Sequence, residues 1–574
     1  MSLSIATDRT KAEIDLLMRR WQLPRERVAD VERLLAAQFE GGTACTLSST
    51  TSHPTAWGSA GQALPLFSSK SSSPPPLVLR RHRDQDYLQA WRFFSAEQTI
   101  ASDLLTRAQR GAPPMTRSVA DLLDLLGAAQ INEQQAKAIT CALNHTLSIT
   151  VGGPGTGKTH TLARFLALLI ADKAEAPPCI HLAAPTGKAA DRMKEAVMQA
   201  AKNLPAILPE TTRTALKKVA EGASTLHRLL GFNPATGRCH FNANRKLRSD
   251  VVVVDECSMI DTLLWQALLV ALEPNTRLVL VGDPHQLESV ASGDVLGSLV
   301  RFARAHSDSP LDRVVVELTK SQRFSSRAGI GTLAAAVVNC RTDEAVTLLH
   351  KNPAPADNSP PGEGLAWLGD HEGRFDWKRL PTLVQKALTD IADAQTPAEA
   401  LSALGVVRLL TAHRERNLGV SGLNDAIHHH LAKRSQPSRP PNQPIIINHN
   451  DPETRLTNGT VGIIMEDSGT RYAYFPADPG AQAPRKMLLS QLPNFSPAWA
   501  LTIHRSQGSE FDQVVVILPP DDSPLATREL IYTAITRARQ SVYVWGSDAT
   551  VRSALDDKFV RCTLLEASLE AQIF

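Results

Sequence analysis

The sequence lacks the cysteine patterns that indicate a disulfide framework or a cysteine metal site. Its seven cysteines are spread over 574 residues, and no two of them form a CxxC pair. They are Cys45, Cys141, Cys179, Cys239, Cys257, Cys340 and Cys562. This spacing argues against zinc ribbons, iron–sulfur clusters and a disulfide-linked secreted fold. We therefore expect a reducing compartment.

Long apolar runs and a strong excess of one charge are also missing. The segment MSLSIATDRTKAEID carries charges where a signal peptide needs an apolar core, and no uncharged run is long enough to span a bilayer. A cytoplasmic protein is predicted. The net charge is only +3, so it does not indicate a nucleic-acid partner, although a local groove can still be basic.

The length and composition indicate several folded domains. Hydrophobic residues make up 43% of the chain and charged residues 21%, which is ordinary globular composition. A chain of 574 residues exceeds one hydrophobic core. Three stretches rich in proline, residues 67–76, 351–364 and 435–444, are interpreted as surface loops or linkers.

Short β-rich runs alternate with helical segments in two parts of the chain. The first part contains LSITV (147–151), IHLAA (180–184), VVVVD (251–255) and RLVLVGD (277–283), and the second contains VVRLLT (406–411), VVVIL (514–518) and SVYVWG (541–546). Such runs, each followed by a helical pattern, predict an α/β fold with two parallel sheets buried between helices. Between them, PIIINHND and TVGIIMED flank an Asn458-Gly459 turn and predict a small β insert.

Residues 152–159, GGPGTGKT, follow the first of these strands and precede the helical stretch HTLARFLALLI. In the pattern G-x-x-x-x-G-K-[ST], backbone amides surround phosphate groups and the next helix adds its positive N-terminal end. We expect Lys158 to contact the β- and γ-phosphates of ATP, and the Thr159 hydroxyl to hold Mg²⁺. The predicted cofactor-binding loop is Gly152, Gly153, Pro154, Gly155, Thr156, Gly157, Lys158 and Thr159.

Polar residues at the ends of two other strands complete the predicted ATP site. The run VVVVDE supplies Asp255 for the metal and Glu256 to orient or activate the attacking water. The strand that ends in GDPHQL would bring Gln286 to the γ-phosphate as a sensor of hydrolysis. An ordinary exit from strand to turn is the alternative interpretation of that segment.

The stretch IYTAITRARQSVYVWG, residues 531–546, places Arg537 and Arg539 between an apolar segment and a strand. A solvated helix end is one interpretation. The other is an arginine that stabilises the transferring phosphoryl group, which raises the rate by roughly a thousandfold or more. Arg537, on the second α/β domain, could reach a nucleotide held by the first, and Arg323 in SQRFSSRAGIG is a further candidate.

Together these segments resemble the ordered motifs of superfamily-one DNA helicases. The set is GGPGTGKT, APTGKAADR, STLHRLLG, VVVVDECSMID, VGDPHQLESV, SQRF, TIHRSQGSEFD and YTAITRAR. More narrowly, the chain resembles the RecD family, the alpha subunits of exodeoxyribonuclease V (RecBCD). The resemblance implies two RecA-like motor domains, ATP-driven 5′→3′ translocation on single-stranded DNA and helicase activity. It also implies double-strand break repair by homologous recombination and degradation of linear DNA.

The resemblance also assigns roles to single residues. The family's adenine-reading glutamine falls on Gln135, with Gln134 as its rival, and its two arginine fingers fall on Arg323 and Arg537; Arg539 has no matching role. The roles of Lys158, Thr159, Asp255, Glu256 and Gln286 agree with those expected above. The implied strand contacts are Pro185, Thr186, Lys188, Thr225, His227, Thr502, His504, Ser506 and Gln507.

The predicted domain boundaries follow from the proline-rich stretches and from the resemblance. Residues 1–112 form a mainly helical N-terminal domain that docks on RecC, and PLVLRRHRDQDYLQAWRFFSAEQTIA is interpreted there as an amphipathic helix; a plain packing domain is the alternative. Residues 113–330, with a small insert at about 190–248, form the first RecA-like domain. Residues 331–440 and 499–574 form the second, and residues 441–498 form an SH3-like insert, on which the 5′→3′ polarity depends.

We expect a subunit of a RecB–RecC–RecD complex. No Asp/Glu/Lys cluster outside the ATP site is arranged for two-metal hydrolysis, so nuclease activity would belong to another subunit. A stand-alone 5′→3′ DNA helicase, an RNA helicase and a non-catalytic interaction subunit are the alternatives. The intact residues Lys158, Asp255, Glu256 and Arg537 argue against the last.

Overall fold

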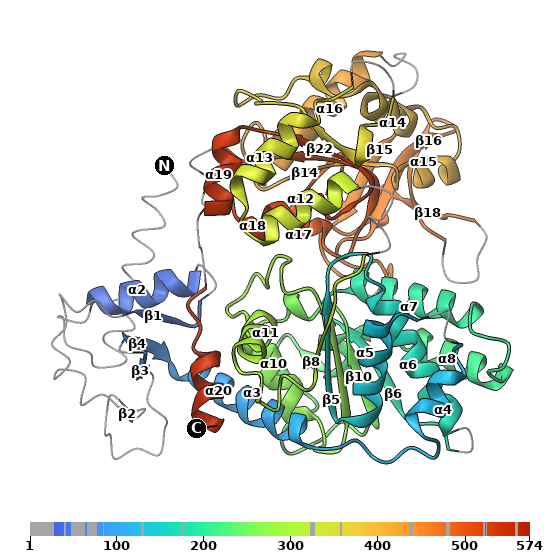
Figure 1. Ribbon diagram of the computed structural model, residues 1–574. Helices are drawn as coiled ribbons and strands as arrows, with labels where there is room; N and C mark the ends of the chain where they lie inside the picture. The colour runs from blue at the N-terminus through green and yellow to red at the C-terminus, as the bar shows by residue number, and fades with distance from the viewer. Residues whose placement is uncertain are drawn as a thin grey trace.

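The computed structural model shows two lobes, one above the other, and a small β-sheet beside the upper lobe (Figure 1). It describes residues 28–39, 42–46, 64–65, 77–83, 85–127, 131–173, 176–321, 328–355, 359–434, 440–451, 453–477, 483–520, 523, 525–556 and 561–573. Within these ranges no helix is long and apolar enough to cross a membrane. All seven cysteines are free thiols.

The lower lobe is built on a parallel sheet with the strand order β12-β5-β11-β10-β6-β7. The strands are β5 (Leu147–Gly152), β6 (Ile180–Ala184), β7 (Ser224–Thr225), β10 (Val251–Val254), β11 (Arg277–Gly282) and β12 (Val315–Leu318). Four of them coincide with the predicted strands. Parallel strands end at a common edge, so the phosphate loop after β5 and the acidic pair after β10 lie on the same side of the lobe.

Helices cover both faces of this sheet, which explains why the central strand β10 consists of four buried valines. Val251 and Val253 of β10 pack with α6 (Lys158–Asp172), α7 (Gly187–Lys202) and α8 (Glu210–Glu221). The alternating residues Val252 and Val254 pack with α3 (Trp91–Gln109), α10 (Thr262–Ala271) and α11 (Val295–Ala305). Each buried valine contributes about 1.5 kcal/mol or more to this packing.

The upper lobe repeats the plan with a second parallel sheet, in the order β13-β22-β21-β14-β20. Its strands are β13 (Leu365–Trp367), β14 (Val407–Thr411), β20 (Ala500–Thr502), β21 (Phe511–Ile517) and β22 (Ala538–Trp545). One face packs on α12 (Ala328–Val338), α13 (Thr342–Lys351), α18 (Arg528–Ile535) and α19 (Asp548–Asp556), and the other on α14 (Thr382–Asp393), α15 (Pro397–Ala403) and α16 (Val420–Arg434). The predicted α/β class with two parallel sheets is confirmed.

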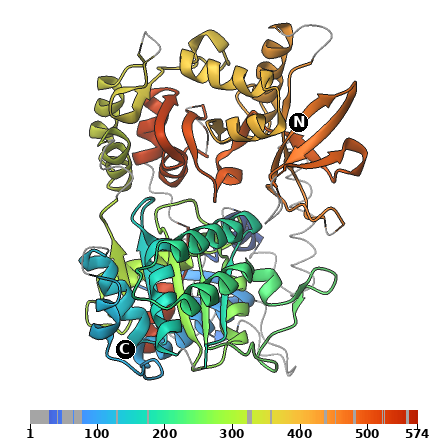
Figure 2. The ribbon, with the colours of Figure 1, turned by 90° about the vertical axis from the view of Figure 1, so that its right-hand side faces the viewer.

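A five-stranded antiparallel sheet, in the order β18-β17-β16-β15-β19, extends from the upper lobe (Figure 2). Its strands are β15 (Gln443–Ile447), β16 (Val461–Asp467), β17 (Thr470–Phe475), β18 (Arg485–Leu488) and β19 (Phe495–Pro497). As predicted, β15 and β16 pair antiparallel. Gly459 takes φ +89° in the turn before β16, a conformation that glycine adopts without strain. The SH3-like assignment of this sheet stays a prediction.

The N-terminal part contains a sheet that the sequence pattern did not predict. The first half of the expected amphipathic helix instead forms the hairpin β3 (Leu77–His82) and β4 (Gln85–Ala90), and the helix begins only at Trp91. With β1 (Ala44–Thr46) and β2 (Leu64–Pro65), the hairpin makes a four-stranded antiparallel sheet under α2 (Val28–Phe39). Ile100, Ala101, Leu104, Leu105 and Ala108 of α3 pack in the core of the first parallel sheet. The domain boundary at residue 112 stays a prediction.

The C-terminal helix α20 (Leu565–Ile573) leaves the upper lobe and packs beside α3 (Figure 1). The contact centres on Glu97 of α3, whose side chain is fully buried. Its carboxylate accepts hydrogen bonds from Thr43 Oγ1 (2.6 Å), Gln89 Nε2 (2.9 Å), Thr563 Oγ1 (3.1 Å) and the Leu564 amide (3.3 Å), and Arg80 lies 3.6 Å away. Burial raises the pKa of Glu97. One carboxylate therefore ties the N-terminal sheet to the C-terminal end of the chain.

Substitution of Glu97 should weaken the packing of the C-terminal helix α20 against α3. We expect Glu97→Ala to remove the shared acceptor of four hydrogen-bond donors, and to make residues 561–573 roughly tenfold more sensitive to limited proteolysis. Glu570→Ala, which removes the more exposed pairs with Arg83 (2.8 Å) and His82 (3.5 Å), is the matched control. Equal cleavage rates in the two variants would show that Glu97 does not hold the helix.

Candidate nucleotide site and strand-contact edge

The loop between β5 and α6 has the backbone of a phosphate-binding loop. Gly155 and Gly157 take φ +75° and +88°, in the left-handed region that favours glycine. A Cβ at Gly157 would lie 2.6 Å from Gln135 Nε2, and one at Gly152 would lie 2.6 Å from the Leu318 carbonyl. The local packing therefore requires glycine at these positions, and α6 begins directly at Lys158.

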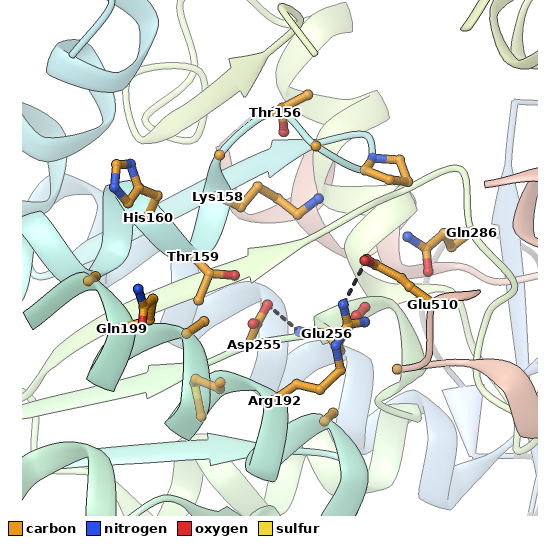
Figure 3. A pocket seen from close by; sticks show the side chains of 18 of the residues that line it. Thr156, Lys158, Thr159, His160, Arg192, Gln199, Asp255, Glu256, Gln286 and Glu510 are labelled. Atoms are coloured by element: carbon orange, nitrogen blue, oxygen red, sulfur yellow. Dashed lines mark hydrogen bonds and ion pairs between the residues drawn. The ribbon is translucent and has the colours of Figure 1, made fainter. Parts of the chain in front are cut away.

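The loop borders a cavity of about 390 Å³ that the two lobes share (Figure 3). Lys158, Thr159, Asp255, Glu256 and Gln286 line it from the lower lobe. Gly508, Glu510 and Arg537 line it from the upper lobe. The structure thus brings together the predicted catalytic residues, except for Arg323, which lies outside the described residues.

Lys158 is directed along the phosphate loop. Its Nζ donates hydrogen bonds to the carbonyls of Gly152 and Gly153, the latter at 3.0 Å. Thr156 Oγ1 donates to the Gly153 carbonyl at 2.8 Å. A phosphate group in the loop would offer this ammonium a stronger, charged acceptor than a carbonyl.

Gln135 lies behind the loop. It is 3% exposed, and its Oε1 accepts the Asn132 amide in the capping box that begins α5 (Glu133–Asn144). Gln134 exchanges two hydrogen bonds with Thr319, at 2.8 and 3.0 Å. Both glutamines are therefore engaged within the protein, and adenine recognition by Gln135 stays a prediction.

The acidic pair follows β10 with an unusual backbone. Glu256 takes φ +54°, which costs a residue with a side chain about 1 kcal/mol or more, and such strain is concentrated at functional sites. Its amide donates to Asp255 Oδ1 at 2.8 Å. Burial, and next the charge of Glu256, raise the pKa of Asp255 to about 6. A divalent cation in the cavity would favour the ionised pair.

Arg537 reaches the cavity from the end of α18, although it is only 3% exposed. Its Nε donates to the Thr533 carbonyl at 3.1 Å, and its Nη1 donates to the Ser509 carbonyl at 3.4 Å. Burial lowers its pKa, while the charges of Glu256 and Glu510 act in the opposite direction. The guanidinium is thus held beside the carboxylates by its own lobe.

An ion pair that the sequence reasoning missed crosses the cavity. Arg192 Nη2 of α7 lies 2.8 Å from Glu510 Oε1 of the upper lobe (Figure 3). Burial lowers the pKa of Arg192, but Glu510, Glu256 and Asp255 outweigh it, so the net pKa is raised. Glu510 also pairs with Arg539 at 3.4 Å. Both partners occur within the quoted motifs APTGKAADR and TIHRSQGSEFD, but only the lobe arrangement pairs them.

The predicted strand-contact residues lie at the carboxyl ends of β6, β7 and β20. Thr186, Thr225 and Thr502 cap the helices that follow, accepting amides at 3.2 Å in each case. Ala184 and Thr225 pair across β6 and β7, next to Pro185. The three hydroxyls thus mark helix N-termini on both lobes, which suits contact with phosphate groups.

The other predicted strand contacts differ in accessibility. Lys188 lies in the first turn of α7 and is half-buried, as are His504 and Pro185, while His227 is exposed. Ser506 is fully buried and donates to the Ile503 carbonyl at 2.7 Å. Gln507 is 7% exposed and donates to the Leu287 carbonyl at 2.9 Å. Ser506 and Gln507 therefore support the edge from inside, and direct strand contact by them stays a prediction.

The donor set of the cavity fits Mg²⁺. Thr159 and Asp255 provide a hydroxyl and a carboxylate on its wall, and Mg²⁺ in such sites takes one or two protein oxygens together with waters and phosphates. Among the described residues no three His, Cys, Asp or Glu side chains cluster as a metal site. Binding of Mg²⁺ by Thr159 and Asp255 stays a prediction.

Two family models match separate parts of this chain. A family model described as an AAA domain matches residues 135–292, and one described as a UvrD-like helicase C-terminal domain matches residues 497–545. The Pif1 helicase structure from Candida albicans is 16% identical, with a TM-score of 0.39, and the alignment covers 73% of this chain and 96% of that one.

Curated relatives are more similar. The ATP-dependent RecD2 DNA helicase of Deinococcus radiodurans is 30% identical over 73% of this chain and 49% of that protein. The RecBCD enzyme subunit RecD of Mycolicibacterium smegmatis is 38% identical over 90% of this chain and 87% of that protein. With this identity over most of both chains, the protein belongs to the RecD family of RecBCD enzyme subunits.

Proposed function

We propose that this protein is an ATP-driven 5′→3′ translocase on single-stranded DNA and a DNA helicase, working in the cytoplasm as a subunit with RecB and RecC. The observation that carries the proposal is the shared cavity, in which Lys158, Asp255 and Glu256 of one lobe face Arg537 of the other. The relatives named RecD support membership of the complex. Repair of double-strand breaks by homologous recombination and degradation of linear DNA follow from that membership.

The residues divide the chemistry between the lobes. Lys158 and the loop amides bind the phosphates, while Thr159 and Asp255 hold Mg²⁺, which when bound neutralises charge on the β- and γ-phosphate oxygens. Glu256 orients the attacking water, Gln286 contacts the γ-phosphate, and Arg537 stabilises the charge on the transferring group. Hydrolysis thus requires that both lobes contribute to one site.

Motion follows from this division. ATP favours the closed arrangement because it gives Arg537 an anion, and loss of phosphate removes that anion. The predicted strand-contact hydroxyls lie on both lobes: Thr186 and Thr225 on the lower, Thr502 on the upper. A change in the separation of the lobes therefore changes the distance between two contact sites on one DNA strand, which gives stepwise translocation.

Unwinding assays test both the activity and its polarity. With ATP and Mg²⁺, we expect the purified chain to unwind duplexes with a 5′ single-stranded tail, and Lys158→Gln to abolish unwinding because it removes the phosphate contact. Preference for a 3′ tail would reject the polarity and the interpretation of residues 441–498. Activity that appears only after addition of RecB and RecC would favour the complex over a stand-alone helicase.

Replacement of Glu256 should separate chemistry from binding. We expect Glu256→Gln to lower kcat for ATP hydrolysis by about a hundredfold or more while KM changes little, because the amide cannot take a proton from water. Glu273→Gln, on an exposed turn before β11, is the control. A proportional rise in KM with unchanged kcat would assign Glu256 to nucleotide binding instead.

Strand binding should depend on pH through Lys188. Burial, and next the positive charges of Arg408 and Arg192, lower the pKa of Lys188 to about 8. The amine is charged below this pH and neutral above it, so affinity for single-stranded DNA should fall as pH rises from 7 to 9.

We expect Lys188→Met to weaken binding about tenfold at pH 7 and to reduce the salt slope by about 1. Lys188→Arg should retain binding and remove the pH dependence, and Lys202→Met, at the exposed end of α7, is the control. Fluorescence anisotropy measures the pH dependence of binding at fixed salt, and a salt series at pH 7 gives the slope. Unchanged pH dependence in Lys188→Arg would show that another group titrates.

A further inference from the structure

The loop of residues 283–287, here called the sensor loop, makes contacts with the upper lobe that the proposed chemistry does not use. Asp283 is fully buried, and its Oδ2 accepts two hydrogen bonds. One comes from Gln286 Nε2 in the same loop (3.1 Å), and the other comes from the Tyr532 hydroxyl of α18 (3.0 Å). One carboxylate oxygen therefore joins the predicted γ-phosphate sensor to the upper lobe.

The Tyr532 hydroxyl also lies against the phosphate loop. A Cβ built on Gly153 would approach this oxygen to 3.0 Å. Tyr532 is 5% exposed, and burial, with the charge of Asp283 next, raises its pKa well above the usual value. The hydroxyl thus stays protonated and can donate to Asp283 at the point where the phosphate loop, the sensor loop and α18 meet.

Thr533, the next residue of α18, makes a second link. Its Oγ1 accepts the Leu287 amide at 2.8 Å, and its carbonyl accepts Arg537 Nε at 3.1 Å. Thr533 is fully buried. The same residue therefore holds the sensor loop with its side chain and the arginine finger with its backbone.

We propose that Tyr532 and Thr533 are positioning residues that couple Gln286 to Arg537. A γ-phosphate offers the Gln286 amide a charged acceptor in place of Asp283. When Gln286 turns to it, Asp283 keeps Tyr532 as its side-chain donor, and the loop shifts against α18. Through Thr533 that shift moves the carbonyl on which Arg537 rests, so the finger advances only when the γ-phosphate is present.

This coupling rests on the proposed ATP hydrolysis, and two readouts keep the two claims apart. The first is amide hydrogen exchange of the full chain with and without Mg²⁺ and a non-hydrolysable ATP analogue. In the wild type we expect the analogue to slow exchange in the loop 152–159 and in α18. In Tyr532→Phe/Thr533→Val, the slowing in the loop should persist while that in α18 is lost.

The second readout is the split between kcat and KM for ATP. Tyr532→Phe alone and Thr533→Val alone should each lower kcat about tenfold, as expected for the loss of one buried hydrogen bond, and should change KM less than about threefold. Thr533→Ser keeps the oxygen and should restore kcat. Tyr543→Phe is the control, because this equally buried tyrosine of β22 packs in the core on the other face of the second sheet.

Three results would overturn the coupling. The first is that α18 responds to the analogue in the double variant as it does in the wild type. The second is that the response is lost in both segments, which would show that the two side chains build the site instead of connecting its halves. The third is a wild-type chain that neither binds the analogue nor hydrolyses ATP; this result would overturn the proposed function, and the coupling with it.

Discussion

The sensor loop, residues 283–287, is held between the lobes by hydrogen bonds from Tyr532 and Gln507 and to Thr533. Gln286 belongs to this loop and Arg537 follows α18, so the contact sets how these two residues are placed at the shared cavity. A few buried hydrogen bonds contribute about 1 kcal/mol each. Binding of a nucleotide can rearrange such a contact, whereas a broad apolar interface would fix the lobes in one arrangement.

The cavity carries both positive and negative side chains, which suits the binding of an anion together with a cation. Lys158 and Arg537 rest on backbone carbonyls, and the paired carboxylates Asp255 and Glu256 face them. Buried ions without full partners are costly. A nucleotide phosphate and Mg²⁺ would supply the missing opposite charges. The unfavourable free energy of these charges in the unliganded protein would therefore favour binding of the ligand. The strained backbone at Glu256 belongs to the same preorganisation.

The strands and the motif residues at their ends could be predicted because they depend on local pattern. Four successive valines before Asp255 indicate a strand buried on both faces, and parallel strands bring their carboxyl ends to one edge. The hairpin at residues 77–90 was missed because its leucines and arginines also fit a helical face. Arg192–Glu510 and Tyr532–Asp283 could not be predicted, since they depend on how two separately folded lobes are oriented.

The C-terminal end of the chain contacts residues 288–293, which follow the sensor loop. Arg561 Nε lies 2.6 Å from Glu288 Oε2, and its Nη1 donates to the carbonyls of Ala291 (3.1 Å) and Gly293 (3.4 Å). Residues 283–287 contact α18, which lies between β21 and β22, and residues 288–293 contact Arg561, which lies beyond the last strand of the second sheet. Two residues further on, Thr563 donates a hydrogen bond to Glu97, so one short C-terminal segment contacts both residues 288–293 and the buried carboxylate beneath the N-terminal sheet.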